Sequence, residues 1–215
     1  SYIESLQKNR VIATAKHFPG HGDTRVDSHI DLPIIDHDMK RLQRIELHPF
    51  KAAIDIGIDA IMTAHIIFKA LDPQTPATLS HNVITGLLRR QLGFKGLVIT
   101  DCMEMKAIDT YFGTVNAAVM AIKAGADIVL ISHTKEKQLG AVKAIKEAVL
   151  NGDIPIETID RAVQRIIDIK YKYNIIDCPY PNRQVIYDTL CSREHISISK
   201  AISQKSITVI KDDKS

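Results

Sequence analysis

The sequence has 215 residues, of which 45% are hydrophobic, so it is long enough to form one large domain with a sizeable core. Its 28 basic and 25 acidic residues give a net charge of only +3, and no cluster of Lys and Arg follows a phosphate backbone, which argues against a nucleic-acid partner. No apolar run approaches the ~18 residues of a membrane span. The widely spaced cysteines Cys102, Cys178 and Cys191 fit neither a disulfide framework nor a CxxC metal site, so we expect plain thiols.

Four short apolar runs along the chain have the character of buried strands. Each run is followed by polar loop residues and then by a helical pattern, and this alternation is typical of parallel βα units. The predicted strands are Val11 to Ala15, Ala60 to Thr63, Leu97 to Thr100 and Ile128 to Ile131.

Helical spacing of apolar residues fills the intervals between these runs. We expect helices at Met39 to Ile45, Pro49 to Gly57, Ser80 to Leu92, Asn116 to Lys123, Lys135 to Leu150 and Pro155 to Tyr173. In the helix from Lys135 the pattern predicts that Val142, Ile145 and Val149 face inward. Four parallel units cannot close an eight-stranded barrel by themselves, so either the sheet is open or the other half of a barrel lies outside this chain.

The pattern changes after Tyr173. A link containing prolines, CPYPNRQ, is followed by a short helical piece near His195 to Ser203 and by one strand-like run, Ser206 to Ile210. We therefore divide the chain into an α/β part at residues 1–176, a linker and helix at 177–205, and the start of a further α/β domain at 206–215.

The loop after the first predicted strand, KHFPGHGDTRVDSH from Lys16 to His29, is unusually dense in titratable groups. Polar residues also follow the other three strands. Because the carboxyl ends of parallel strands meet on one face, these side chains should share a pocket. The strand-end residues are Lys16, His17, His65, Asp101, Ser132 and His133.

Two of these features allow more than one interpretation from the residues alone. Asp101 follows a strand directly, where an Asp is either an N-cap of the next helix or a rigidly held nucleophile. Asp27 and His29 are two residues apart, which suits either an Asx-type turn or a carboxylate that orients an imidazole for proton transfer.

Four stretches carry a resemblance to a known family. KHFPGHGDTRVDSH, ELHPFKAAIDIGIDAIMTAH, PATLS and GLLRRQLGFKGLVITDCMEM resemble successive signatures of glycoside hydrolase family 3, collinear from about Val11 to Ile176. They are most similar to its bacterial β-N-acetylglucosaminidase branch, whose members act on peptidoglycan fragments. The resemblance implies an α/β fold, a (β/α)8 TIM-type barrel of which this chain holds the last four βα units, followed by the beginning of a second α/β domain.

The resemblance also implies roles for individual residues. Asp101 matches the catalytic nucleophile, His29 the acid/base of this branch and Asp27 the partner of that histidine. Lys16 and His17 match residues that bind hydroxyls of the sugar. His65 lies in the matching MTAH motif with no role carried over, and Cys102 departs from the acidic or small residue that usually follows the nucleophile.

The activity so implied is retaining hydrolysis of terminal β-linked N-acetylhexosamine, with no cofactor and no metal, by a protein that is a monomer at full length. An Asp and an Arg that contact the sugar in the family have no matching position here, so we expect the natural protein to be longer at both ends. Its location stays open between the cell wall or exterior and the cytoplasm of a bacterium.

Two rival classes remain at this stage. One is a metal-dependent barrel hydrolase with His17, His65 and Asp101 as zinc ligands, although no HxH or HExxH pair supports it. The other is a non-catalytic glycan-binding protein on the same scaffold.

Overall fold

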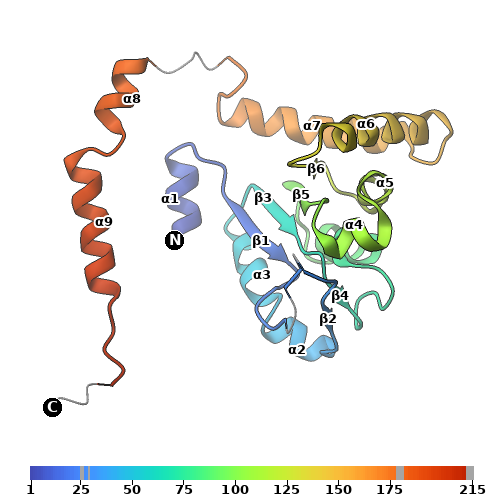
Figure 1. Cartoon of the computed structure of the whole chain (residues 1–215), viewed down its shortest axis with the longest axis horizontal. Coiled ribbons are helices and arrows are strands. Elements are labelled where there is room, and N and C mark those ends of the chain that lie inside the picture. Colours follow the sequence, from blue (N-terminus) through green and yellow to red (C-terminus); the bar gives the residue numbers. More distant parts are fainter. Residues whose placement is uncertain (25–26, 29, 178–181, 212–215) are drawn as a thin grey trace. The chain divides into compact units, whose positions relative to one another are not determined.

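The computed structural model describes residues 1–24, 27–28, 30–177 and 182–211. The chain forms two compact units, Ser1–Ile175 and Ile176–Ser215. The first unit contains the sheet and all the residues discussed below as a site (Figure 1).

The centre of the first unit is a parallel sheet of four strands in the order β1-β3-β5-β6. The strands are β1 (Thr14–Phe18), β3 (Ala60–Thr63), β5 (Leu97–Cys102) and β6 (Ile128–Leu130). The predicted parallel βα arrangement is therefore confirmed. The first strand was predicted three residues too early, because pairing with β3 starts at Thr14 and continues to the fully buried Phe18, while Val11 is about half exposed.

A second, two-stranded parallel sheet joins β2 (Ile34–Ile35) and β4 (Ile67–Phe68). This small sheet could not be predicted from the sequence, since a strand of two residues shows no alternation of apolar and polar positions. Ile35 and Phe68 are buried in the main core, so this small sheet closes the core beneath the loops that follow β1 and β3.

Helices follow each strand of the main sheet, as expected. Their bounds are α1 (Tyr2–Lys8), α2 (Met39–Arg44), α3 (His48–Asp55), α4 (Lys106–Phe112), α5 (Thr114–Ala124), α6 (Lys135–Leu150) and α7 (Ile156–Lys172), with a 3₁₀ turn η1 (Ala77–Leu79) and a π-helix η2 (Asn82–Gln91). The sequence analysis missed α1 and α4, which are only seven residues long. Near the start of η2, the Ser80 hydroxyl accepts from the Val83 N–H at 3.3 Å.

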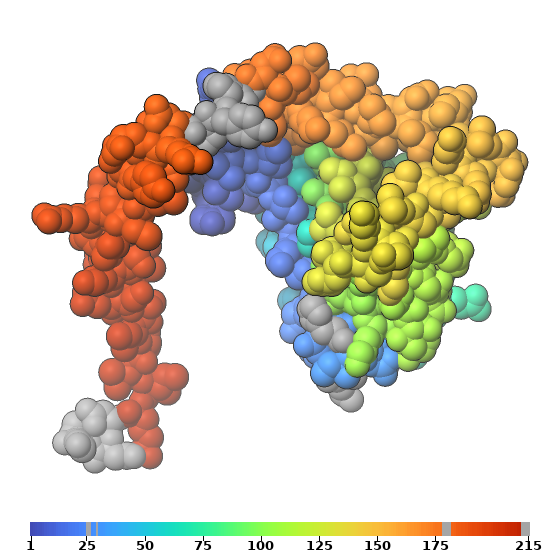
Figure 2. All heavy atoms as spheres, turned by 45° about the horizontal axis from the view of Figure 1, so that its top comes forward, coloured from blue at the N-terminus to red at the C-terminus, as the bar shows by residue number. Residues whose placement is uncertain are grey.

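Helices α6 and α7 lie next to each other along one margin of the first unit (Figures 1 and 2). Ile145 and Val149 pack beside Ile122, Ala148 and Ile154, as predicted. The prediction for Val142 was wrong, because its side chain is 68% exposed. Val142 lines an open hollow between α6 and α7 together with Ile145 and Val149.

Two buried carboxylates anchor the amino-terminal end of the sheet. Asp127, just before β6, accepts from the Arg89 and Arg165 guanidinium groups and from the Val98 N–H. Asp59, just before β3, accepts from Lys172 and from the Tyr173 hydroxyl, and burial together with this carboxylate raises the pKa of Tyr173. Both carboxylates fasten helices to the sheet.

The second unit contains α8 (Arg183–Thr189) and α9 (Arg193–Ser206), neither of which has a buried residue. The predicted strand from Ser206 to Ile210 was wrong, because the described residues there form no strand. A strand needs a partner for its backbone hydrogen bonds, and the described part of this unit offers only helices. In the described residues as a whole, no helix combines the length and apolar character needed to cross a membrane.

Candidate active site

The structure brings together two of the predicted strand-end residues, one from β1 and one from β5. His17 Nε2 lies 3.3 Å from Asp101 Oδ2, and the two side chains are 22% and 24% exposed. β3 runs between these strands, so the pair bridges three adjacent strands at their carboxyl ends. A carboxylate and an imidazole at this distance, open to solvent on one side, can reach a bound molecule.

The environment of Asp101 tests the helix-cap interpretation of this residue. Asp101 is part of β5, and its Oδ1 accepts from the Cys102 N–H at 2.7 Å. The next helix, α4, begins only at Lys106 and has Met105 at the N-cap position. The helix-cap interpretation is therefore wrong, and the carboxylate is fixed on the strand by its neighbour's amide.

The loop after β1 is held to itself through His21. The His21 Nε2 lies 3.1 Å from the Ser28 hydroxyl, and its Nδ1 lies 3.1 Å from the Thr24 hydroxyl. The His21 ring also meets the His17 ring edge to face, with 5.6 Å between centroids. Two side-chain contacts and one ring contact thus set the position of His17 against the loop.

The predicted acid/base pair belongs to the same loop. Asp27 is exposed, and its backbone carbonyl accepts from the N–H groups of Ile30 and Asp31 at 2.9 and 3.1 Å. His29 lies outside the described residues. The pairing of Asp27 with His29 therefore stays a prediction.

Lys16 and His17 also line a hollow of about 640 Å³ between β1, α2 and α3. Asp101 is not among its lining residues, so His17 is the side chain that connects the hollow with the nucleophile candidate. Lys16 itself is exposed.

A residue that sequence reasoning did not single out lies in this hollow. The Glu46 side chain is 6% exposed; its Oε1 accepts from Arg41, and its Oε2 has no hydrogen-bond partner in the described part of the chain. Gly20 is required above it, because its φ is +152° and an added Cβ would lie 2.8 Å from Glu46 Cβ. The glycines of the GHG stretch are evident in the sequence. The contact of Gly20 with the Glu46 side chain, 26 residues later, could not be predicted from it.

His65 has a structural position beneath Asp101. It is 1% exposed, its Nδ1 lies 2.9 Å from the Thr78 hydroxyl, and its Nε2 lies 3.0 Å from the Cys102 carbonyl. Burial lowers the pKa of His65 to about 4, so the ring is neutral near pH 7 and its Nε2–H donates to the carbonyl. With both ring nitrogens engaged, His65 cannot join His17 and Asp101 as a zinc ligand, which removes the ligand set of the metal-hydrolase alternative.

Comparisons with known proteins agree with the fold described above. Residues 1–169 match the family described as "Glycosyl hydrolase family 3 N terminal domain". The fold is thus the TIM-barrel-like α/β fold of this domain, and the predicted α/β class is confirmed. The chain belongs to glycosyl hydrolase family 3.

Three relatives give the range of similarity. A family 3 beta-N-acetylglucosaminidase from Paenibacillus sp. str. FPU-7 matches 99% of the chain at 46% identity with a TM-score of 0.94, and the chain covers 40% of that protein. Beta-hexosaminidase A of Pseudoalteromonas piscicida is 31% identical over 98% of the chain, which covers 38% of its length. The beta-glucoside phosphorylase BglX bound to 2FGlc shares 25% identity and a TM-score of 0.89, with 40% of it covered. The chain thus spans about two fifths of the length of these relatives.

Proposed function

We propose that the protein containing this chain is a retaining exo-β-N-acetylglucosaminidase in which Asp101 is the nucleophile. The observation that carries the proposal is the Asp101 carboxylate on the end of β5, fixed by the Cys102 N–H and 3.3 Å from His17 Nε2. The names of the relatives support the sugar specificity, since Beta-hexosaminidase A and the Paenibacillus enzyme both act on N-acetylated aminosugars by name.

The first step needs a nucleophile below the sugar ring and an acid near the leaving oxygen. Asp101 attacks the anomeric carbon while the bond to the leaving saccharide breaks, which gives a glycosyl ester on Asp101. A proton passes to the departing oxygen, so that the leaving group is released as a neutral alcohol. His17 beside Asp101 stabilises the carboxylate before attack and can donate to a sugar hydroxyl.

We propose that His29 donates this proton to the departing oxygen and that Asp27 is the partner of His29. An imidazole has an unperturbed pKa near 6.5, so it can give a proton in the first step and take one from water in the second, both near neutral pH. A carboxylate hydrogen bonded to the other ring nitrogen stabilises the imidazolium. The second step cleaves the ester on Asp101 and returns the sugar with its original anomeric configuration.

We further propose that Lys16 and His17 bind sugar hydroxyls and that the natural substrates are peptidoglycan fragments. Lys16 is exposed beside the hollow on β1, and the unpartnered Glu46 Oε2 is an acceptor available in the same hollow. An imidazole in place of a second carboxylate adds no negative charge to the pocket, so we propose that phosphate can compete with water as the acceptor. Release of free sugar identifies hydrolysis, whereas a sugar 1-phosphate identifies phosphorolysis.

The test is to trap the covalent intermediate. The natural protein that contains this chain is incubated with a fluorinated N-acetylglucosaminyl substrate that forms the ester quickly and loses it slowly, and peptides are then sequenced by mass spectrometry. We expect the added mass on Asp101, and none in Asp101→Asn. An adduct on another carboxylate overturns the assignment, and tight sugar binding with no adduct and no turnover identifies a non-catalytic glycan-binding protein instead.

A further inference from the structure

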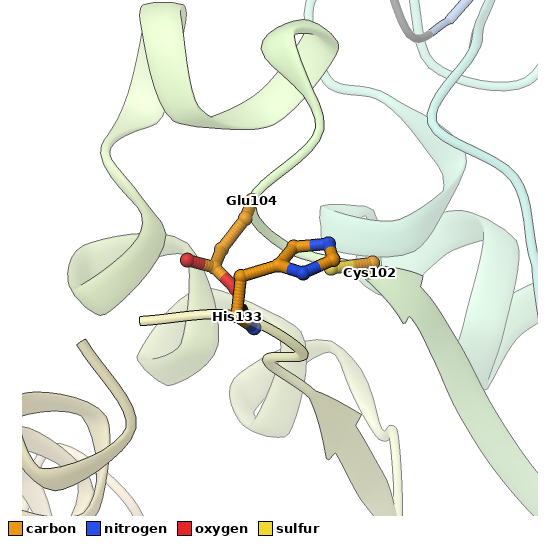
Figure 3. Close-up of side chains that lie close together, drawn as sticks. All are labelled: Cys102, Glu104 and His133. Atoms are coloured by element: carbon orange, nitrogen blue, oxygen red, sulfur yellow. Dashed lines mark hydrogen bonds between the residues drawn. The ribbon is translucent and has the colours of Figure 1, made fainter. Parts of the chain in front are cut away.

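A second group of chemically competent side chains lies between the ends of β5 and β6. Cys102 is the last residue of β5, Glu104 follows in the loop to α4, and His133 lies in the loop between β6 and α6. One ligand atom of each, a sulfur, a carboxylate oxygen and a ring nitrogen, lies within 4.8 Å of the others. Figure 3 shows the three side chains directed toward one another from the two loops.

Hydrogen bonds hold the backbone around these three residues in place. The N–H of Met103, a fully buried residue between Cys102 and Glu104, donates to the Leu130 carbonyl at 2.9 Å. Glu104 Oε2 accepts from the His133 N–H at 2.6 Å and from the Thr134 N–H at 3.4 Å, and Oε1 accepts from the Thr134 N–H at 3.1 Å. The Thr134 side chain also hydrogen bonds to this carboxylate, so a metal ion would take the place of one of these weaker contacts. The two loops are therefore joined, and the Glu104 carboxylate is already oriented.

The ligand types select among metal ions. A thiolate, an imidazole and a carboxylate suit zinc and its close analogues, whereas magnesium and calcium prefer oxygen ligands alone. Zinc bonds of about 2.0–2.3 Å place the donor atoms of one ion roughly 3.3–3.8 Å apart. The His133 residue is exposed, so its ring can turn on its Cβ to shorten its own distances to the other two ligand atoms.

We propose that Cys102, Glu104 and His133 bind one divalent cation of the zinc class, with water in the fourth position. On binding, the Cys102 thiol releases its proton to solvent and the sulfur bonds to the metal as the thiolate. The ion joins the β5–α4 loop to the β6–α6 loop beside Asp101. It is separate from the glycosidase chemistry, in which no step uses these three side chains.

The site is tested by binding Zn²⁺ and Co²⁺ to the 215-residue chain. We expect one Zn²⁺ per chain by calorimetry, and a near-ultraviolet thiolate-to-cobalt band with the strong visible bands of tetrahedral Co²⁺. Because even outer-shell partners of metal sites change affinity by about 10–100-fold, Cys102→Ser and His133→Ala should each weaken Zn²⁺ binding by roughly tenfold or more, and Cys102→Ser should remove the near-ultraviolet band.

Matched controls come from the second unit, where Cys191 and His195 are both exposed. Cys191→Ser and His195→Ala should bind Zn²⁺ like the parent chain, and Asp101→Asn should do so as well. Circular dichroism without metal checks the fold, and His133→Gln serves if His133→Ala unfolds. Absence of Zn²⁺ uptake by the folded parent chain, unchanged binding by Cys102→Ser, or loss of binding in Asp101→Asn overturns the proposal. None of these measurements depends on glycosidase activity.

Discussion

The two ends of the main sheet use charged side chains in opposite ways. At the amino-terminal end, Asp127 is surrounded by two guanidinium groups and a backbone amide, and its side chain is 1% exposed. At the carboxyl-terminal end, Asp101 has one backbone amide and one imidazole, and its side chain is 24% exposed. A saturated, buried carboxylate stabilises the fold, whereas a partly exposed carboxylate with few partners can react.

The sharpest test of this contrast is Asp101→Asn. Loss of the nucleophile should lower turnover on the order of 10⁴-fold or more, while the free energy of unfolding should change by less than about 1 kcal/mol, because the side chain is not buried in a network. Release of chromophore from an aryl N-acetyl-β-glucosaminide and urea unfolding measure the two quantities. A stability loss equal to that of a buried anchor would contradict the contrast.

His29→Ala tests the proposal that the loop after β1 supplies the proton. The rate on substrates with poor leaving groups should fall by roughly 10²–10⁴-fold, the usual contribution of a general acid. Activated aryl glycosides depart without protonation and should lose less. Equal losses on the two substrates would argue against His29 as the donor.

Asp127→Ala tests the opposite end of the sheet. It leaves the Arg89 and Arg165 charges without their buried partner, and breaking such a pair costs about 3–5 kcal/mol of unfolding free energy. Urea unfolding measures the loss, and the catalytic rate per folded molecule should be unchanged. Asp168→Ala is the matched control, since Asp168 is an exposed carboxylate on the same helix as Arg165. A loss as small as that of the control would show that Asp127 is no anchor.

His65 gives the smallest of these effects, and it depends on pH. Its pKa is about 4 when folded, against about 6.5 in the unfolded chain, so protons bind preferentially to the unfolded state between these values. Above pH 6.5 the lowered pKa of His65 contributes to the free energy of unfolding. This contribution is lost as the pH falls toward 4, by about 2 kcal/mol between pH 7 and pH 5. Unfolding curves of the parent chain and of His65→Gln should differ by this amount in their pH dependence. Parallel pH profiles would refute the neutral, buried assignment.

Sequence patterns predicted those elements that have clear boundaries. The bounds of β3 and α6 were predicted residue for residue, because β3 is a short run that follows the charged Asp59 and ends at the polar Thr63, and α6 lies between Thr134 and the Asn-Gly pair at 151–152. α4 escaped detection because seven residues give fewer than two full turns of periodicity. The run from Ser206 to Ile210 has strand-like composition, but composition cannot supply a partner strand.

The site was less accessible to sequence reasoning than the fold. The strand ends predicted that His17 and Asp101 would lie close together, and they do, since parallel strands end on a common face. The direction of the Asp101 carboxylate could not be read, because a helix cap and a nucleophile have the same local sequence. The link from Glu104 to the His133 amide, 29 residues away, depends on β5 and β6 being neighbours and has no sequence signal.

The helices of the second unit have a consequence for hydrogen exchange. α8 and α9 bury none of their side chains, and isolated helices of 7 and 14 residues are marginal in water. Their amides should therefore take up deuterium at rates close to those of an unstructured peptide. The amides of α5, which has six buried residues, should exchange only through the larger openings of the first unit.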